Sequence, residues 1–287
     1  MTARILDGKA TAAQIRSEVA ERVRALAERG ITPGLAAVLV GDDQASRIYV
    51  GQKHKACADV GIRSEQIDLP AYVTEHELLA TIRRLNRDPE IHGIIVQLPL
   101  PGHLRELDIQ SAIAAEKDVD GLHPLNIGLM LRRGHSFLPA TPYGIVELML
   151  RTGVPLEGAE VCIVGYGDLV GAPLSVMLTQ NSIRGNATVV STHVKTRDLT
   201  RHTLTADIIV AAAGVPQLIR ADMVMPGATV IDVGVHRTPE GLVGDVKFDE
   251  VVEVAGAISP VPGGVGPMTV AMLLVNTVQA AEVQAFS

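Results

Sequence analysis

The sequence predicts an α/β protein made of two domains, each built on a parallel sheet. Two observations favour this fold class. Short apolar runs rich in Val, Ile and Leu alternate with longer segments of helical periodicity, which is typical of βαβ units. The length of 287 residues suits two domains of roughly 100–200 residues each.

The first half of the chain alternates between helix and strand. Residues 11–29 place Ile15, Val19 and Val23 near one face of a helix, and Gly30 follows as a stop signal. A second helix at 44–60 is followed by Gly61, and a third at 74–86 begins with a possible capping box. The strands of this half are predicted at 35–40, 65–69 and 91–98, one after each helix.

A segment rich in proline and glycine, residues 121–143, interrupts this alternation and is interpreted as the passage between domains. The first domain is therefore expected to comprise residues 1–138 and a final helix at 268–287, which returns to pack on it. The second domain comprises residues 139–267. Its predicted helices are 141–153 and 170–179, and its predicted strands are 161–164, 188–191, 208–212 and 229–233.

Composition excludes several classes of protein. Aromatic residues make up 2% of the chain and the net charge is −7, so we expect no nucleic-acid partner. No apolar run approaches the ~18 residues of a membrane span, and the N-terminus lacks a signal-peptide core. We therefore expect a cytoplasmic protein without a membrane partner. Cys57 and Cys162 lie far apart, which supports neither a disulfide framework nor a metal site.

A glycine-rich turn predicts a dinucleotide site in a Rossmann-like second domain. Gly165, Gly167 and Gly171 follow the predicted strand at 161–164. Glycine permits close approach of the backbone to a pyrophosphate, and the following helix offers free N–H groups. The spacing is GxGxxxG instead of the usual GxGxxG, so a tight turn that binds nothing stays open as an alternative.

The next strand bears on the choice between NADP and NAD. An NAD site usually has Asp or Glu at the end of this strand, where it holds the ribose 2′-hydroxyl. Residues 189–197 contain no carboxylate, whereas Lys195 and Arg197 follow the strand. This favours NADP, although both cations could simply be solvated.

Several polar residues in the first half could carry chemistry. Tyr49 and Lys53 share one helical face, Gln97 stands at the end of an apolar strand, and Asp120 lies in a turn. Ligands bind at the carboxyl ends of parallel strands. An ordinary surface pair and an ordinary Asp-Gly turn remain the alternatives for Tyr49–Lys53 and Asp120.

Five segments together resemble one family. They are Tyr49-Val-x-x-Lys53, Val96-Gln-Leu-Pro-Leu-Pro101, Lys117-Asp-Val-Asp-Gly-Leu-His-Pro124, Asp232-Val-Gly234 and Pro260-Val-Pro-Gly-Gly-Val-Gly-Pro-Met-Thr269. In this order and spacing, they are similar to the bifunctional methylenetetrahydrofolate dehydrogenase/methenyltetrahydrofolate cyclohydrolases. The resemblance covers nearly the whole chain. It implies an active-site cleft between two α/β domains, a homodimer, and a role in one-carbon metabolism and purine biosynthesis.

The resemblance also implies roles for individual residues. Lys53 would be the catalytic lysine, with Tyr49 beside it in the folate cleft and Gln97 as its hydrogen-bond partner. Asp120 would bind the pteridine ring, because a carboxylate accepts from a pair of N–H donors. Gly263 and Gly264 would line the folate cleft. The dinucleotide would contact Gly165, Tyr166, Gly167, Ser191, Lys195, Gly214, Val235 and Thr269, the last near the nicotinamide.

The sequence departs from the family pattern at several positions. Tyr166-Gly167 replaces a common Arg-Ser, and Val194 replaces a serine, so two usual contacts to the 2′-phosphate of NADP are missing. Ala140, Leu125 and His236 replace a common Cys, Tyr and Asn. NAD therefore stays possible as the coenzyme. A monofunctional NAD-linked dehydrogenase, a non-catalytic dinucleotide sensor and an amino-acid dehydrogenase are the alternative functions.

Overall fold

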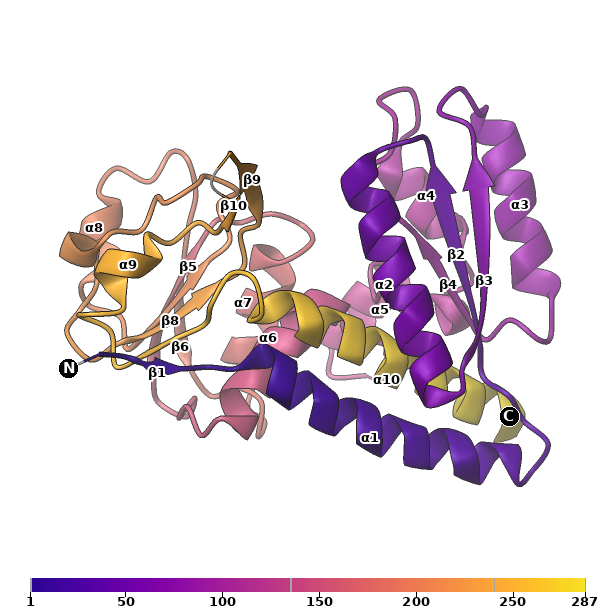
Figure 1. Ribbon diagram of the computed structural model, residues 1–287, viewed down its shortest axis with the longest axis horizontal. Helices are drawn as coiled ribbons and strands as arrows, with labels where there is room; N and C mark the ends of the chain where they lie inside the picture. Colours follow the sequence, from indigo (N-terminus) through magenta and orange to yellow (C-terminus); the bar gives the residue numbers. More distant parts are fainter. Residues whose placement is uncertain (1, 135, 240, 287) are drawn as a thin grey trace. The chain divides into compact units, whose positions relative to one another are not determined.

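The computed structural model describes residues 2–134, 136–239 and 241–286. The chain forms two compact units. We name them by their main sheets (Figure 1). The three-stranded unit comprises Gln14–Ala140 and Val270–Ser287, and the six-stranded unit comprises Met1–Ala13 and Thr141–Thr269. Each unit is a parallel sheet with helices, as the sequence predicts.

The three-stranded unit is built on strand β2 (Gly34–Val40), which pairs in parallel with β3 (Arg63–Leu69) and β4 (Gly93–Val96). Every residue of β2 is buried, which is typical of a central strand covered on both faces. Helices α2 (Gln44–Val60) and α3 (Glu75–Arg87) connect the strands. The side chains of Leu78, Ile82 and Leu85 on α3 are fully buried in the core of this unit.

Local signals fix the ends of these helices. The Asp43 side chain accepts a hydrogen bond from Ser46 N, and α2 ends at Gly61 in the left-handed region, with φ of 82°. Thr74 and Glu77 form the capping box that starts α3. Capping groups satisfy backbone N–H groups that the first turn leaves without partners. This explains why the sequence predicts α2 to the residue and α3 within one residue.

The segment interpreted as the passage between domains contains a helix. Helix α5 (Pro124–Leu131) begins with proline at its first position, and the His123 ring accepts from Leu125 N. Proline is well suited to the first turn of a helix, where its missing N–H costs nothing. The boundary between the two units lies within 121–143, at Ala140, and the sequence did not predict α5. Helix α4 (Glu106–Ala112) and the short 3-10 helix η1 (Ala115–Lys117) precede it.

The six-stranded unit has the strand order β1-β11-β8-β7-β5-β6, with every pairing parallel. The strands are β1 (Arg4–Ile5), β5 (Glu160–Val164), β6 (Thr188–Thr192), β7 (Ile208–Ala211), β8 (Thr229–Asp232) and β11 (Ala257–Ile258). The order reverses at β5, because β6 lies on one side of it and β7 on the other. Such a reversal is the usual ligand position in an open α/β sheet.

Short elements complete the six-stranded unit. They are α7 (Gly171–Thr179), α8 (Leu199–Thr203), the 3-10 helix η2 (Ala221–Met223), the antiparallel hairpin β9 (His236–Thr238) and β10 (Gly241–Val243), and α9 (Phe248–Val251). Three longer helices belong to both units: α1 (Gly8–Ala27), α6 (Ala140–Arg151) and α10 (Val265–Phe286).

The N-terminal residues belong to the other unit from the one that the sequence predicts. Residues 1–138 were expected in the first domain, but β1 pairs with β11 in the sheet of the six-stranded unit. The N-terminal strand has only two residues, too few to produce a pattern in the sequence.

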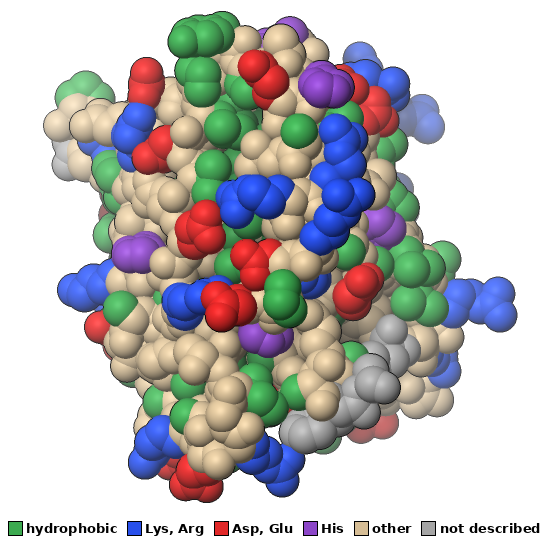
Figure 2. All heavy atoms as spheres, turned by 90° about the vertical axis from the view of Figure 1, so that its right-hand side faces the viewer, with side chains coloured by type: hydrophobic (Ala, Val, Ile, Leu, Met, Phe, Trp, Pro, Cys, Tyr) green, Lys and Arg blue, Asp and Glu red, His purple; other side chains and the backbone are tan. Residues whose placement is uncertain are grey.

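Two further features concern the helices and the surface charge. No helix among the described residues combines the length and apolar character that crossing a bilayer requires. On the face shown in Figure 2, Lys and Arg side chains are interspersed with Asp and Glu. Ion pairs between surface residues, such as Arg63–Glu90 and Arg84–Glu65, reflect this mixing.

Candidate active site and dinucleotide site

Lys53 and Gln97 meet in the three-stranded unit. Lys53 lies on α2, and Gln97 follows β4, where its backbone N–H still pairs with Val38 O at 2.9 Å. The Lys53 Nζ donates to Gln97 Oε1 at 3.1 Å. The other end of the amide is also fixed, because Gln97 Nε2 donates to Leu98 O at 2.7 Å. The carboxyl end of β4 thus presents an oriented amide oxygen to an amine.

Burial lowers the pKa of Lys53 below its ordinary value, and the negative charge of Asp120 opposes this effect. A lysine in such a place loses a proton more readily than a surface lysine, because desolvation disfavours the ammonium form. The structure therefore brings an amine, an amide and a carboxylate to one place in the same unit, from residues 44 and 67 positions apart in the sequence.

Tyr49 stands one helical turn before Lys53 on α2. The two side chains project from the same helical face, and the Tyr49 side chain is 38% exposed. Its ring is thus available to a ligand that approaches Lys53.

The turn that carries Asp120 is supported by its two neighbours in the motif. Lys117 is buried, and its Nζ donates to Leu85 O at 3.3 Å and Asp88 O at 2.7 Å, at the end of α3. Asp118, also buried, accepts from His123 N at 2.8 Å and from Asn126 Nδ2 at 2.8 Å. Lys117 and Asp118 are therefore structural residues that hold Asp120 in position.

The glycine-rich turn lies at the carboxyl end of β5 in the six-stranded unit. Gly165 has a φ of 109°, and a Cβ there would stand 2.1 Å from Ala212 O. A Cβ at Gly171 would stand 2.0 Å from Gly165 O. The turn therefore requires glycine at both positions, and it brings bare backbone to the start of α7. This fits the close approach that a pyrophosphate needs.

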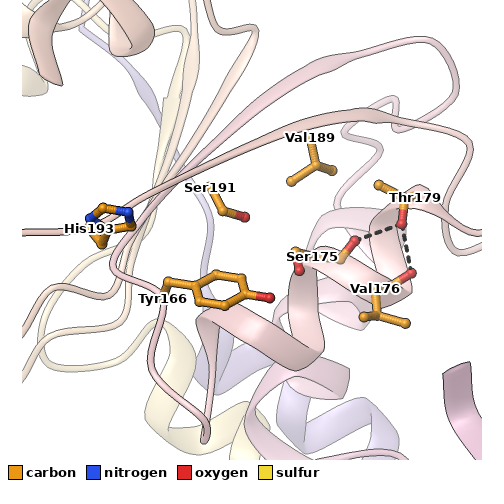
Figure 3. Close-up of a pocket in the computed structure, with 7 residues that line it drawn as sticks. All are labelled: Tyr166, Ser175, Val176, Thr179, Val189, Ser191 and His193. Atoms are coloured by element: carbon orange, nitrogen blue, oxygen red, sulfur yellow. Dashed lines mark hydrogen bonds between the residues drawn. The ribbon is translucent and has the colours of Figure 1, made fainter. Parts of the chain in front are cut away.

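A pocket of about 440 Å³ adjoins this turn. Tyr166 extends its ring along α7 toward Ser175, and Ser191 and His193 come from β6 and the residue after it (Figure 3). His193 Nδ1 accepts from Lys195 N at 3.1 Å, so its Nε2 carries the proton in the neutral ring. The pocket residues are Tyr166, Ser175, Val176, Thr179, Val189, Ser191 and His193.

Two of the residues expected to bear on the 2′-phosphate lie outside that lining. Val194 is 93% exposed, and Lys195 is exposed as well. The pocket itself is lined by hydroxyl, aliphatic and ring groups without a Lys or Arg side chain among the described lining residues. Gly167 lies in the exposed part of the turn.

Gly214 and Val235 lie in the loops that follow β7 and β8, which are neighbouring strands. Gly214 N donates to Asp245 Oδ2 at 2.8 Å. The other carboxylate oxygen, Asp245 Oδ1, lies 2.7 Å from His236 Nε2. Asp245 belongs to none of the motifs singled out in the sequence, and its contacts with these two loops become visible only in the structure.

Gly263, Gly264 and Thr269 belong to the six-stranded unit, whereas Lys53 belongs to the three-stranded unit. Gly263 O accepts from Lys9 N at 3.0 Å at the start of α1. Thr269 lies in the first turns of α10, and its Oγ1 donates to Thr141 Oγ1 at 3.1 Å. Across the described residues, no group of His, Cys, Asp and Glu side chains is arranged to hold a metal ion.

Comparison with known proteins identifies two family regions. Residues 6–120 match the catalytic domain of tetrahydrofolate dehydrogenase/cyclohydrolase, and residues 139–285 match its NAD(P)-binding domain. These regions together cover most of the chain.

Individual relatives are similar over nearly their whole length. The bifunctional protein FolD of Bordetella petrii is 55% identical over 281 residues, which cover 98% of this chain and 94% of that protein. The structure of the bifunctional FolD methylenetetrahydrofolate dehydrogenase/cyclohydrolase of Campylobacter jejuni is 46% identical, with a TM-score of 0.94 and coverage of 98% of this chain and 99% of that chain. The Trypanosoma brucei methylenetetrahydrofolate dehydrogenase-cyclohydrolase, solved with NADP cofactor and an inhibitor, is 38% identical, with a TM-score of 0.95 and full coverage of both chains.

Proposed function

The chain belongs to the tetrahydrofolate dehydrogenase/cyclohydrolase family, and we propose that one site around Lys53 serves both of the reactions that this family name describes. The enzyme oxidises 5,10-methylenetetrahydrofolate to the methenyl form and hydrolyses that product to 10-formyltetrahydrofolate. The three-stranded unit, with the final helix, binds the folate, and the six-stranded unit binds the dinucleotide. The observation that carries the proposal is the 3.1 Å contact between Lys53 Nζ and Gln97 Oε1.

In the dehydrogenase step, the dinucleotide supplies the hydride acceptor, and the methylene carbon of the folate becomes a methenyl cation. The protein contributes orientation, which accounts for much of the catalysis in such a transfer. Asp120 accepts from the amino and ring N–H groups of the pterin, and Tyr49 lies beside the reacting part of the folate. Gly263 and Gly264 are proposed to contact the folate, and Thr269 the nicotinamide.

The hydrolysis step needs a proton acceptor close to a cationic substrate. Lys53 suits this role because burial lowers its pKa, and a bound cation lowers it further. Gln97 Oε1 accepts one Lys53 N–H, which orients the amine. Water oxygen bonds to the methenyl carbon while Lys53 takes a water proton. The carbon–N5 bond then breaks, the hydroxyl proton passes to N5, and Lys53 releases its proton to solvent.

The variant Lys53→Met tests this assignment. Methionine has similar length but no basic nitrogen, so we expect hydrolysis of methenyltetrahydrofolate to fall by about 100-fold or more. Binding of NADPH to the variant is expected to stay within twofold. Lys55→Met, on another face of α2, is the matched control. Full hydrolysis by the Lys53 variant would contradict the proposal.

We propose NADP as the oxidant. Its support is the absence of a carboxylate at the end of β6, the exposed Lys195 and Arg197 that follow β6, and the Trypanosoma brucei relative complexed with NADP. One observation favours NAD as a second candidate: Lys and Arg are missing from the described lining of the pocket. The ratio of kcat/KM for NADP and NAD decides between the two. If NADP is used, Lys195→Ala lowers kcat/KM for NADP by about fivefold and leaves NAD unchanged.

We also propose that the enzyme is a cytoplasmic homodimer whose formyl product serves purine biosynthesis. Family likeness supports these proposals. Light scattering in solution tests the dimer, since a mass equal to one chain would contradict it. Cell fractionation tests the location, and purine dependence of a strain that lacks the gene tests the role.

A further inference from the structure

A buried carboxylate, Asp245, joins two loops at the carboxyl edge of the six-stranded sheet. Its Oδ2 accepts from Ala213 N at 2.6 Å and from Gly214 N at 2.8 Å, both after β7. Its Oδ1 lies 2.7 Å from His236 Nε2, after β8. The Asp245 side chain is 0% exposed and that of His236 is 21% exposed. We assign Nε2 as the donor of this hydrogen bond, because a carboxylate oxygen accepts.

A second carboxylate holds the backbone of the first. Asp232, the last residue of β8, accepts from Gly234 N at 3.1 Å, Asp245 N at 2.9 Å and Val246 N at 3.0 Å. A Cβ at Gly234 would stand 2.2 Å from Asp245 Oδ1, and one at Gly244 would stand 1.8 Å from Asp232 Oδ2. The two ends of the β9–β10 hairpin are thus fixed against β8. We name Asp232, Asp245 and His236 the carboxylate clamp.

The clamp lies on the β7–β8 side of β5, where a dinucleotide held at a Rossmann-like sheet would place its second nucleoside. The pyrophosphate site at Gly165 follows β5, and β6 lies on one side of that strand. The pocket on the β6 side suits one nucleoside. The loops after β7 and β8 lie on the opposite side, where the other nucleoside of a dinucleotide extends. These loops carry Gly214 and Val235.

We propose that His236 is a positioning residue for the dinucleotide, which acts by holding Asp245 and thereby sets the spacing between Gly214 and Val235. The inference rests on the proposed function. His236 directly precedes the exposed part of the hairpin and directly follows Val235, so its hydrogen bond to Asp245 fixes the Val235 backbone. The same carboxylate fixes Gly214. Both walls of this nucleoside site therefore depend on one acceptor group.

Replacing the imidazole by a phenyl ring isolates this effect. The variant His236→Phe keeps a ring of similar shape but removes the donor, so Asp245 Oδ1 loses its partner while it stays buried. A charge-assisted hydrogen bond of this kind contributes typically 1.5–3 kcal/mol, which corresponds to about a 10-fold to 100-fold change in an equilibrium constant. His236→Gln retains an N–H donor and is the conservative variant. His202→Phe, on α8 of the same unit, is the matched control.

The enzyme provides an internal reference for the measurement. Hydrolysis of methenyltetrahydrofolate needs no dinucleotide, so a general loss of folded protein lowers both activities, whereas a positioning defect lowers only one. Three quantities are measured for each variant: the Kd of NADPH by fluorescence titration, the dehydrogenase KM for NADP against kcat, and the hydrolysis rate with supplied methenyltetrahydrofolate.

For His236→Phe we expect a 10-fold or greater rise in the NADPH Kd and in KM for NADP, with hydrolysis within twofold of the unaltered enzyme. His236→Gln is expected to recover most of the binding, and His202→Phe to behave as the unaltered enzyme. An unchanged NADPH Kd, or a parallel fall of both activities, would overturn the inference. If the unaltered protein lacked both activities, the proposed function would fail, but the NADPH titration would still test the clamp.

Discussion

Replacing Gln97 by glutamate puts a carboxylate where the neutral Oε1 now lies 3.1 Å from Lys53 Nζ. At that distance, two unit charges attract by about 5 kcal/mol at an effective dielectric constant of about 20. Desolvation of the carboxylate offsets part of this energy. Opposite charges at such a separation raise the pKa of a lysine by about 1–3 units.

The consequence is a displaced pH profile for hydrolysis. Lys53 must be neutral to accept a proton from water, so a higher pKa moves the rising limb of the profile to higher pH. We expect a shift of about 1–3 pH units in the Gln97→Glu variant, and a rate at pH 7 that is at least about 10-fold lower. The assay follows the loss of methenyltetrahydrofolate from pH 6 to 10.

Two further variants sharpen this experiment. Gln97→Met removes the acceptor without adding charge, so its rate is expected to fall without a comparable shift along the pH axis. Gln66→Glu adds the same charge on the exposed strand β3 and is expected to leave the profile in place. A Gln97→Glu profile that coincides with that of the unaltered enzyme would refute the reasoning about Lys53.

Three other predictions concern separate parts of the molecule. Asp120→Asn removes a charge that raises the pKa of Lys53, so the hydrolysis limb moves to lower pH and folate KM rises about 10-fold; an unchanged KM would count against this role. Gly165→Ala puts a Cβ 2.1 Å from a carbonyl oxygen at a φ of 109° and is expected to lower the free energy of unfolding in urea by about 3 kcal/mol, whereas Gly167→Ala, with open space around it, should change it little. Burial raises the pKa of Asp232 to about 7, so between about pH 4 and pH 7 the folded state holds a proton that the unfolded state releases. The free energy of unfolding therefore falls as the pH rises through this window, by at most about 4 kcal/mol. The same dependence of Tm on pH in the unaltered protein and in Asp232→Asn would contradict this prediction.

The sequence predicts best where a local signal and a long apolar run coincide. The bounds of α2 were predicted correctly because Asp43 and Gly61 mark its two ends. The sequence failed at α5, where Pro124 and the nearby glycines were interpreted as breakers although proline at a first helical position favours a helix. The two-residue strand β1 was also missed, because it exists only through pairing with β11, more than 250 residues away.

The candidate site shows the same limit. Tyr49, Lys53, Gln97 and Asp120 were singled out by unusual polar positions together with a family resemblance. The supporting residues were not, because Lys117 and Asp118 act through backbone groups of α3 and of the turn before α5. Asp245 was missed as well, since nothing in its neighbours indicates a contact with Ala213, 32 residues earlier. Contacts of this kind depend on the order of strands in the sheet.

The chain crosses between its two units three times, within α1, at the start of α6 and within α10. Neither half of the protein is consequently encoded by one uninterrupted stretch of gene. A shortened polypeptide that begins at residue 14 would lack β1, which is the edge strand of the six-stranded sheet. One cut to end at residue 269 would retain the six-stranded sheet but lose 18 residues of the three-stranded unit. Exchange of one half between relatives therefore needs three matched junctions.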